Sequence, residues 1–132
     1  MNQTLNNQCP FCNLEPDREI IIESSASFSV FDRFPVSKGH ALIILKRHCA
    51  NYFELTSEEQ TSCWSMVNTV QQTLTERFNP DGFNIVINVY SAAGQTVPHV
   101  HIHLIPRYLG DESQPDGGFR GVVHDRKVKS KE

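Results

Sequence analysis

The alternation of histidine with aliphatic residues in VPHVHIHLIP, positions 97–106, restricts the local structure of this chain more than any other segment. Three of the six histidines, His99, His101 and His103, stand at every second position. Successive side chains of a β-strand point to opposite faces, so the three imidazoles should share one face. The other face should be buried, because it carries Val100, Ile102 and Leu104. The segment is therefore predicted to be a strand with one apolar face and one face for chemistry.

The remaining chain adds further strands and one long helix. Apolar or β-branched runs predict strands in four other segments, at 20–22, 27–31, 39–46 and 83–90. Thr56 followed by Glu59 forms a capping box, which is the signal of a helix start. Apolar residues then recur at intervals of three and four, as in an amphipathic helix, at Trp64, Val67, Val70, Leu74 and Phe78. Strands around one helix indicate an α+β fold with a largely antiparallel sheet, in one domain spanning residues 1–132.

Charge and hydropathy argue against nucleic acid and membranes as partners of this chain. A formal net charge of -3 argues against a protein that coats nucleic acid. The sequence has no basic, apolar leader and no run of about 20 apolar residues, so a membrane protein is not expected. We expect a cytoplasmic location, and we expect two isolated cysteines, Cys49 and Cys63, to be reduced core residues.

Three histidines on one strand face admit two chemical interpretations. A single zinc ion bound by all three is disfavoured, because the outer positions lie about 13 Å apart and a Zn–N bond is only about 2 Å long. A neighbouring pair could still share a metal. The second interpretation is nucleophilic catalysis by a neutral imidazole, with phosphate oxygens held by donors in the preceding loop, namely Gly94, Gln95 and Thr96.

The motif CPFC at positions 9–12 is a second candidate site. Two cysteines separated by two residues serve zinc sites and redox sites alike. A redox pair normally opens a helix, whereas Pro10 and Asn13 suggest a turn around Cys9 and Cys12. A structural zinc ion needs two further ligands, which the motif itself does not supply.

Several motifs together resemble the histidine triad (HIT) superfamily. HVHIHLI matches its alternating triad, NVYSAAGQTVPH resembles the segment that leads into the triad, and FDRFPVSKGHALIILKRH resembles an earlier strand region. The similarity runs from about residue 9 to residue 107, which leaves 108–132 as a C-terminal extension. The resemblance implies a HIT-like fold, in which a mainly antiparallel five-stranded sheet with one long helix extends across a homodimer.

The resemblance also implies the activity and its central residues. Family members cleave at the α-phosphate of nucleotides, as hydrolases or transferases, through a covalent nucleotidyl-histidine intermediate. The middle triad histidine, here His101, is the nucleophile. His103 would orient and support it, and Thr96 would assist the leaving group. A small-molecule nucleotide is the implied substrate, and no organic cofactor is implied.

Other positions match the family's nucleotide-binding residues. Gln95 and the amides around Gly94 would hold phosphate oxygens, while Asn88 and His40 would line the same site. Asp32, eight residues before His40, would accept hydrogen bonds from the ribose hydroxyls. By this resemblance the catalytic residues are His40, Gln95, Thr96, His101 and His103. The nucleotide-binding residues are Asp32, Asn88, Gly94, Gln95, Thr96, His101 and His103.

Some relatives complete a CxxC zinc site with two histidines, and the matching residues here are His48 and His99. The resemblance thus implies a structural zinc ion bound by Cys9, Cys12, His48 and His99. One triad histidine would hold the metal while its neighbour, His101, carries out the attack.

The segment AGQTVPHVHIHLIPR looks closest to the dinucleoside polyphosphate hydrolase branch of the superfamily. A nucleoside phosphoramidase is an alternative, and a zinc-stabilised nucleotide-binding regulatory module is an alternative of another class. Near the C-terminus, residues 118–123 could form a short edge strand. Arg107 and Arg120 would either contact distal phosphates or form a solvated surface, and His124 has no evident partner.

Overall fold

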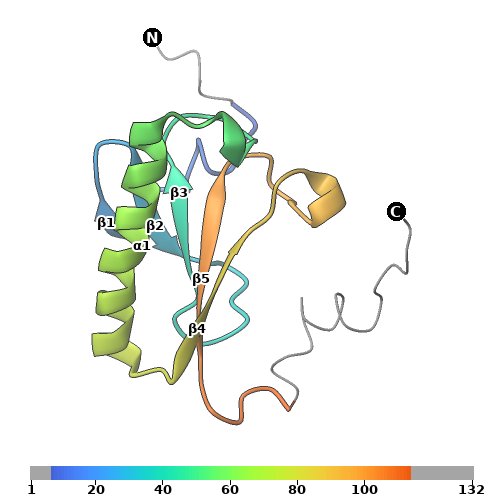
Figure 1. Ribbon diagram of the computed structural model, residues 1–132. Coiled ribbons are helices and arrows are strands. Elements are labelled where there is room, and N and C mark those ends of the chain that lie inside the picture. The colour runs from blue at the N-terminus through green and yellow to red at the C-terminus, as the bar shows by residue number, and fades with distance from the viewer. Residues whose placement is uncertain (1–6, 114–132) are drawn as a thin grey trace.

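The computed structural model describes residues 7–113, which form five strands, one long helix and two short 3-10 turns (Figure 1). The elements follow in the order β1 (Ile20–Glu23), β2 (Ser27–Phe31), β3 (Ala41–Leu45), η1 (Tyr52–Glu54), α1 (Ser57–Phe78), β4 (Gly82–Ile87), η2 (Ser91–Ala93) and β5 (His101–Arg107). Neighbouring strands pair antiparallel in the spatial order β1-β2-β3-β5-β4. The predicted α+β class, with a five-stranded antiparallel sheet and one long helix, is confirmed.

Helix α1 covers one face of this sheet (Figure 1). Alternate residues of β3 and β5 point toward it, and the main core consists of buried apolar side chains from the helix and these central strands, among them Ile43, Leu45, Val70, Leu74, Ile102 and Leu104. Burying one such side chain contributes roughly 1.5–3 kcal/mol to stability. This face is therefore the main source of the fold's stability.

The opposite face of the sheet carries the triad histidines and a smaller apolar cluster. Four buried side chains of β2 and β3 form this cluster, with two partly buried side chains of the N-terminal segment against them, namely Phe28, Val30, Leu42, Ile44, Phe11 and Leu14. In the register of β3 and β5, Leu42 pairs with His103 and Ile44 pairs with His101. His101 and His103 therefore lie on the sheet face away from α1, as the alternation predicts.

The capping box at the start of α1 is formed as predicted. Thr56 Oγ1 accepts a hydrogen bond from the Glu59 amide at 3.0 Å, and Glu59 Oε1 accepts one from the Thr56 amide at 2.9 Å. Arg47 donates two further hydrogen bonds to the Glu59 carboxylate, 2.7 and 2.9 Å long. At the other end, Asn79 closes the helix in the left-handed conformation, with φ of 50°.

Trp64 departs from the predicted apolar face of this helix. It is 39% exposed, and its indole donates a hydrogen bond to the Tyr52 hydroxyl at 3.0 Å. The buried residues of α1 form a stripe beside Trp64 and are Cys63, Met66, Val67, Val70 and Leu74. The helical period was sufficient to predict the helix. The buried side chains that face the sheet do not include Trp64, the largest apolar side chain of the predicted face.

The strand predicted at 83–90 ends earlier, at Ile87. Three residues later Tyr90 takes a positive φ of 71°, which is incompatible with a strand. The chain thus leaves the sheet edge before the η2 turn, which Figure 1 shows projecting away from α1.

The strand predicted at 97–106 begins only at His101. Pro98 has no amide hydrogen to donate to a neighbouring strand. The residues around it form a tight turn, closed by a 2.7 Å hydrogen bond from the His99 amide to the carbonyl two residues earlier. His99 therefore lies at the entrance of β5 and not within it.

The possible edge strand at 118–123, together with Arg120 and His124, lies outside the described residues. Within residues 7–113, no helix is long and apolar enough to cross a membrane.

Gly39 is needed where the β2–β3 loop passes the end of α1. Its φ is +90°, and a Cβ at this position would lie 2.8 Å from Phe78 Cδ2 and 3.2 Å from Pro106 Cγ.

Gly39→Ala is expected to lower the free energy of unfolding by about 2–4 kcal/mol, through backbone strain and the clash. Urea unfolding measures this value. Gly82→Ala is the control, because no heavy atom lies within 4 Å of a Cβ there, and its change should stay below about 0.5 kcal/mol. Equal losses in the two variants would contradict this role of Gly39.

Candidate active site and metal centre

Two side-chain clusters meet at the start of β5. His101 and His103 belong to the first cluster, to which the β2–β3 loop adds Asp32 and His40. The second cluster includes His99, which is fully buried at the strand entrance. The structure thus divides the three triad histidines between two clusters.

The main chain fixes the tautomer of His101. Its Nδ1 lies 2.7 Å from the carbonyl oxygen of His99, so Nδ1 carries the proton and donates it. The lone pair is then on Nε2. The residue is 7% exposed, and burial lowers the pKa of His101 below its usual value, against the opposing effect of that hydrogen bond. A neutral imidazole with its Nε2 lone pair free is suited to nucleophilic attack or to proton abstraction.

A chain of hydrogen bonds gives His40 and His103 the opposite tautomer. The Val36 amide donates to His40 Nδ1 at 3.1 Å, so a neutral His40 carries its proton on Nε2. This nitrogen lies 3.0 Å from His103 Nδ1 and 3.3 Å from Asp32 Oδ2. His103 Nδ1 therefore accepts a hydrogen bond, which leaves the His103 proton on Nε2. The Nε2 atom of His103 is therefore a hydrogen-bond donor, whereas the Nε2 atom of His101 carries a lone pair.

Burial keeps these imidazoles neutral. The pKa of His103 is lowered to about 4, first by burial and then by the neighbouring His101 and His40. Burial also lowers the pKa of His40, although the Asp32 carboxylate opposes this shift. At neutral pH the cluster therefore acts by directed hydrogen bonds and not as a group of cations.

Asp32, His40 and His103 each place one potential ligand atom within 4.8 Å of the others. Such a set is typical of a metal site, yet the proton of His40 occupies the nitrogen that would bind the ion. Moving this proton to Nδ1 would bring it against the amide hydrogen of Val36. A hydrogen-bonded chain therefore describes this cluster better than a metal site.

The second cluster brings together the four predicted metal ligands, Cys9, Cys12, His48 and His99. His99 Nδ1 lies 3.2 Å from Cys9 Sγ, 3.6 Å from Cys12 Sγ and 3.2 Å from His48 Nδ1. Cys12 Sγ lies 3.4 Å from His48 Nδ1. Tetrahedral coordination with bonds of about 2.0–2.3 Å needs ligand atoms roughly 3.3–3.8 Å apart. The cluster therefore fits a metal ion.

The outer hydrogen bond of His99 supports this assignment. Its Nε2 donates to the Leu45 carbonyl oxygen at 2.6 Å, so the Nδ1 lone pair faces the thiols. Burial lowers the pKa of His99 to about 4, which keeps the ring neutral as a metal ligand must be. Cys9 and Cys12 lie in turns and not at a helix start, which favours the metal interpretation over the redox one.

In this structure the Gln95 side chain braces the loop before β5. It is buried, accepts a hydrogen bond from the Tyr90 amide at 2.6 Å, and donates one to the Ala50 carbonyl at 2.9 Å. The amide of Gly94 is also used inside the loop, where it donates to Ser91 at 2.9 Å. The contact of Gln95 with phosphate oxygens stays a prediction, and its observed contacts assign it a role in loop structure.

Thr96, Gly94 and Asn88 lie on the accessible side of this loop. Thr96 and Gly94 are exposed and Asn88 is half-buried. Gly94 closes the η2 turn with φ of 95°, and a Cβ on it would lie 3.9 Å from Asn88 Nδ2. The structure thus brings Asn88 and Gly94 together, and their contacts with a nucleotide stay predictions.

Sequence reasoning missed two residues of these clusters. Val36 contributes only its main-chain amide, which any residue except proline would supply, so the sequence carries no signal for it. The ring of Phe11 contacts the rings of His99 and His101, with centroid distances of 5.8 and 5.0 Å. The position of Phe11 between two metal ligands is the only signal that could have found it.

A comparison with protein families yields a match to the model described as HIT domain, over residues 13–110. The chain belongs to the HIT domain family. The resemblance seen in the sequence motifs is thereby confirmed. A HIT family protein from Bacillus subtilis has a similar structure, with a TM-score of 0.73 and 32% identity over 79% of this chain and 76% of that one. A zinc-bound histidine triad family protein from Mycobacterium smegmatis gives a TM-score of 0.73 and 30% identity, over 80% and 78% of the two chains.

HIT-domain relatives with named activities include nucleotide phosphatases. The bis(5'-adenosyl)-triphosphatase of Dictyostelium discoideum is 36% identical over 114 residues, which cover 86% of this chain and 76% of the relative. The bis(5'-nucleosyl)-tetraphosphatase (asymmetrical) of Schizosaccharomyces pombe is 34% identical over 109 residues, covering 83% of this chain and 60% of the relative. Nucleotide hydrolysis is thus an activity found in this HIT family.

The hydrogen bonds of this HIT domain predict opposite tautomers for neighbouring histidines. At neutral pH, His101 should carry its proton on Nδ1, whereas His99 and His40 should carry theirs on Nε2. Nitrogen-15 NMR of histidine-labelled protein distinguishes protonated from unprotonated ring nitrogens. The three residues serve as internal controls for one another. A His101 ring protonated on Nε2 would show that the site is arranged differently.

Proposed function

We propose that this HIT-domain chain is a nucleotidyl hydrolase or transferase that cleaves a (di)nucleoside polyphosphate at its α-phosphate, with His101 as the nucleophile. The observation that carries the proposal is the fixed tautomer of His101, whose Nδ1 donates to the His99 carbonyl oxygen and whose Nε2 lone pair is free to attack. The names of the relatives from Dictyostelium discoideum and Schizosaccharomyces pombe support this substrate class.

The reaction would proceed by two displacements at phosphorus. In the first, His101 Nε2 bonds to the α-phosphorus while the bond to the leaving phosphate oxygen breaks, and the leaving group keeps that electron pair. The ring retains its Nδ1 proton and becomes cationic beside the His99 carbonyl oxygen. In the second, water attacks the same phosphorus, the N–P bond breaks, a proton passes to solvent and a nucleoside monophosphate leaves. Two accessible steps replace one difficult step.

Neighbouring residues would stabilise the phosphate oxygens. His103 would donate from Nε2 to a phosphate oxygen, because its Nδ1 is engaged by His40. His40 is then a positioning residue that acts through His103. Thr96, exposed on the loop before β5, would donate to the leaving group. Gln95 would hold that loop, and so Thr96, in place through its two main-chain contacts.

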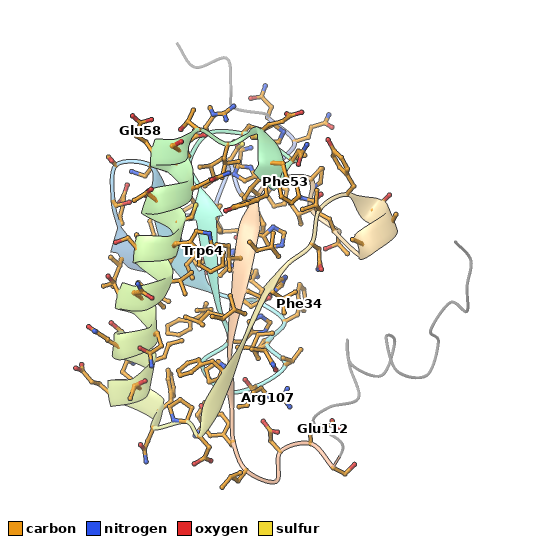
Figure 2. All side chains as sticks on the ribbon, viewed as in Figure 1. Phe34, Phe53, Glu58, Trp64, Arg107 and Glu112 are labelled. Atoms are coloured by element: carbon orange, nitrogen blue, oxygen red, sulfur yellow. The ribbon has the colours of Figure 1, made fainter. Side chains whose placement is uncertain are left out.

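The nucleoside would lie beside the β2–β3 loop. Asp32 Oδ1 accepts a hydrogen bond from the Phe34 amide at 2.9 Å, and Oδ2 faces His40. The remaining lone pairs of this carboxylate would accept from the ribose hydroxyls. Phe34 is 84% exposed, and Figure 2 shows it across the sheet from α1. An exposed apolar side chain beside a polar site suits contact with a base, and Asn88 and Gly94 would line the phosphate end.

We propose that zinc is the metal of the Cys9, Cys12, His48 and His99 site. Two thiolates and two imidazoles in tetrahedral spacing form a donor set that zinc favours. The zinc-bound relative from Mycobacterium smegmatis supports this choice. With four protein ligands, the ion would be structural and would hold the N-terminal segment against the sheet.

We also propose a homodimer in which the sheet continues through β4. This strand lies at one end of the strand order, so within residues 7–113 one of its edges has no neighbouring strand. Ile85 of β4 is 49% exposed. Natural proteins usually cover such an edge, and a second copy of β4 would do so.

Removal of the nucleophile should abolish the covalent intermediate. Intact-protein mass is measured under a non-acidic quench after brief mixing with diadenosine triphosphate and, separately, with an adenosine phosphoramidate. The unaltered chain should gain one adenylyl group, and His101→Ala should gain none. Turnover by His101→Ala should fall on the order of 10³-fold or more, because the two-step route is lost.

The two substrates in this experiment separate the competing functions. Faster loading by the phosphoramidate would replace the proposed substrate class with a phosphoramidase. A His101→Ala variant within tenfold of the unaltered chain would refute the nucleophile. Nucleotide binding with no adduct and no product would indicate a regulatory module.

Loss of one metal ligand should cost both metal and stability. The purified chain should carry about one zinc ion, measured by mass spectrometry of the metal, whereas Cys12→Ser should carry less than about half. The free energy of unfolding of Cys12→Ser should fall by about 2 kcal/mol or more, because the ion binds only the folded chain. Cys63→Ala is the control, since Cys63 is buried outside the cluster, and it should keep its zinc. Full stability of Cys12→Ser would rule out the structural role.

A further inference from the structure

Phe11 is an aromatic residue that contacts both clusters although neither function uses it. Its ring lies 5.0 Å from the ring of His101 at an interplanar angle of 71°. It lies 5.8 Å from the ring of His99 at 87°. Such edge-to-face pairs are directional contacts, worth more than the apolar area they bury. Phe11 therefore lies where it can influence the orientation of the His101 ring.

The position of Phe11 is set from both sides by metal ligands. Cys9 precedes it by two residues and Cys12 follows it directly. Their sulfur atoms lie 3.2 Å from His99 Nδ1 and 3.4 Å from His48 Nδ1, respectively. The turn between them is closed by hydrogen bonds to the Cys9 carbonyl oxygen from the amides of Cys12 and Asn13, 3.2 and 3.1 Å long. A metal ion on the two thiols would therefore fix the segment that carries Phe11.

Beneath the ring of Phe11 lies the smaller apolar cluster of the sheet. Its members are Phe28, Val30, Leu42 and Ile44, and both Phe11 and Leu14 pack against it. The two residues thus share a segment and an apolar contact surface. Only Phe11 adds a ring that meets the imidazole of His101. This difference makes Leu14 a matched control for Phe11.

One hydrogen bond does not fix the plane of an imidazole. The bond from His101 Nδ1 to the His99 carbonyl oxygen holds one edge of the ring, while rotation about the terminal side-chain torsion has broad minima. The ring of His103, 5.1 Å away at 66°, packs against the ring of His101, and Phe11 adds a second ring contact. A displacement of the attacking nitrogen by about 1 Å can cost a rate factor of about 10². The ring contacts therefore bear directly on the attack.

We propose that Phe11 is a positioning residue that holds the His101 ring in its attacking orientation, and that the metal site sets the position of Phe11. This rests on the proposed nucleophilic role of His101. The metal ion then influences the reaction without contacting the substrate. It acts through the packing of Phe11 and through the placement of His99.

The test compares Phe11→Ala, Phe11→Leu and Leu14→Ala in the full zinc-loaded chain. Single-turnover adenylylation by diadenosine triphosphate is followed by intact mass, with KM and zinc content measured alongside. Phe11→Ala should slow adenylylation by about 10- to 100-fold, with KM within threefold and about one zinc ion retained. Leu14→Ala should stay within threefold of the unaltered chain. Phe11→Leu should give an intermediate rate, and it decides the question if Phe11→Ala loses zinc.

A second measurement does not depend on activity. NMR of the His101 ring should show shifted ring-proton resonances in Phe11→Ala, because the ring current of Phe11 is lost, and averaged ring-nitrogen signals if the ring becomes mobile. These signals should not change in Leu14→Ala. Altered His101 signals and slowed adenylylation confined to the Phe11 variants would establish the positioning role.

Two outcomes would overturn the inference. One is a zinc-loaded Phe11 variant that adenylylates within threefold of the unaltered chain. The other is a Leu14→Ala variant that is as slow as Phe11→Ala, because the effect would then be general packing. If the unaltered chain forms no adduct, the proposed function fails instead. The NMR comparison then decides alone, and unchanged His101 signals in Phe11→Ala would refute the positioning role.

Discussion

One buried hydrogen bond, from His99 Nε2 to the Leu45 carbonyl oxygen at 2.6 Å, holds in place the residue that the two clusters of this protein share. It ties the entrance of β5 to the end of β3 and turns the other ring nitrogen toward the two thiols. The carbonyl oxygen of His99 in turn accepts a hydrogen bond from His101 Nδ1. The ring of His99 therefore sets the geometry of the metal site, and its main chain sets the tautomer of the neighbouring imidazole. Both clusters depend on where this one residue is held.

The two faces of the sheet have separate tasks. Helix α1 buries one face, and the large apolar residues there supply most of the stability. The other face carries the imidazoles beside a smaller apolar cluster. Polar groups such as these imidazoles are costly to bury unless they are paired. Among residues 7–113, no buried side-chain nitrogen or oxygen lacks a hydrogen-bond partner. Burial also keeps the imidazoles uncharged, which removes most of the cost of enclosing several of them together.

The sequence was sufficient to predict those features of the structure that the pattern of side chains determines. The alternation around His101 and His103 predicted the strand and its chemical face, and the resemblance to the superfamily predicted which residues gather at the candidate metal centre. Features carried by the main chain could not be predicted, because amides and carbonyls are the same in nearly every residue. The Val36 amide fixes a tautomer, and the Gln95 amide group turns inward to brace its own loop. The predicted start of β5 at residue 97 was wrong, because Pro98 lies in a tight turn before the strand.

The double use of His99 limits how this protein can diverge in evolution. The carbonyl group that fixes the tautomer of His101 exists whatever side chain stands at position 99, but it stays in place only while something anchors that position. A descendant that lost the two thiols would keep the His101 tautomer only if another contact held position 99 in place. The loop residues 94–96 make none of the contacts that hold the His99 ring in place. Changes in that loop can therefore alter the surroundings of the site while the tautomer of His101 is preserved.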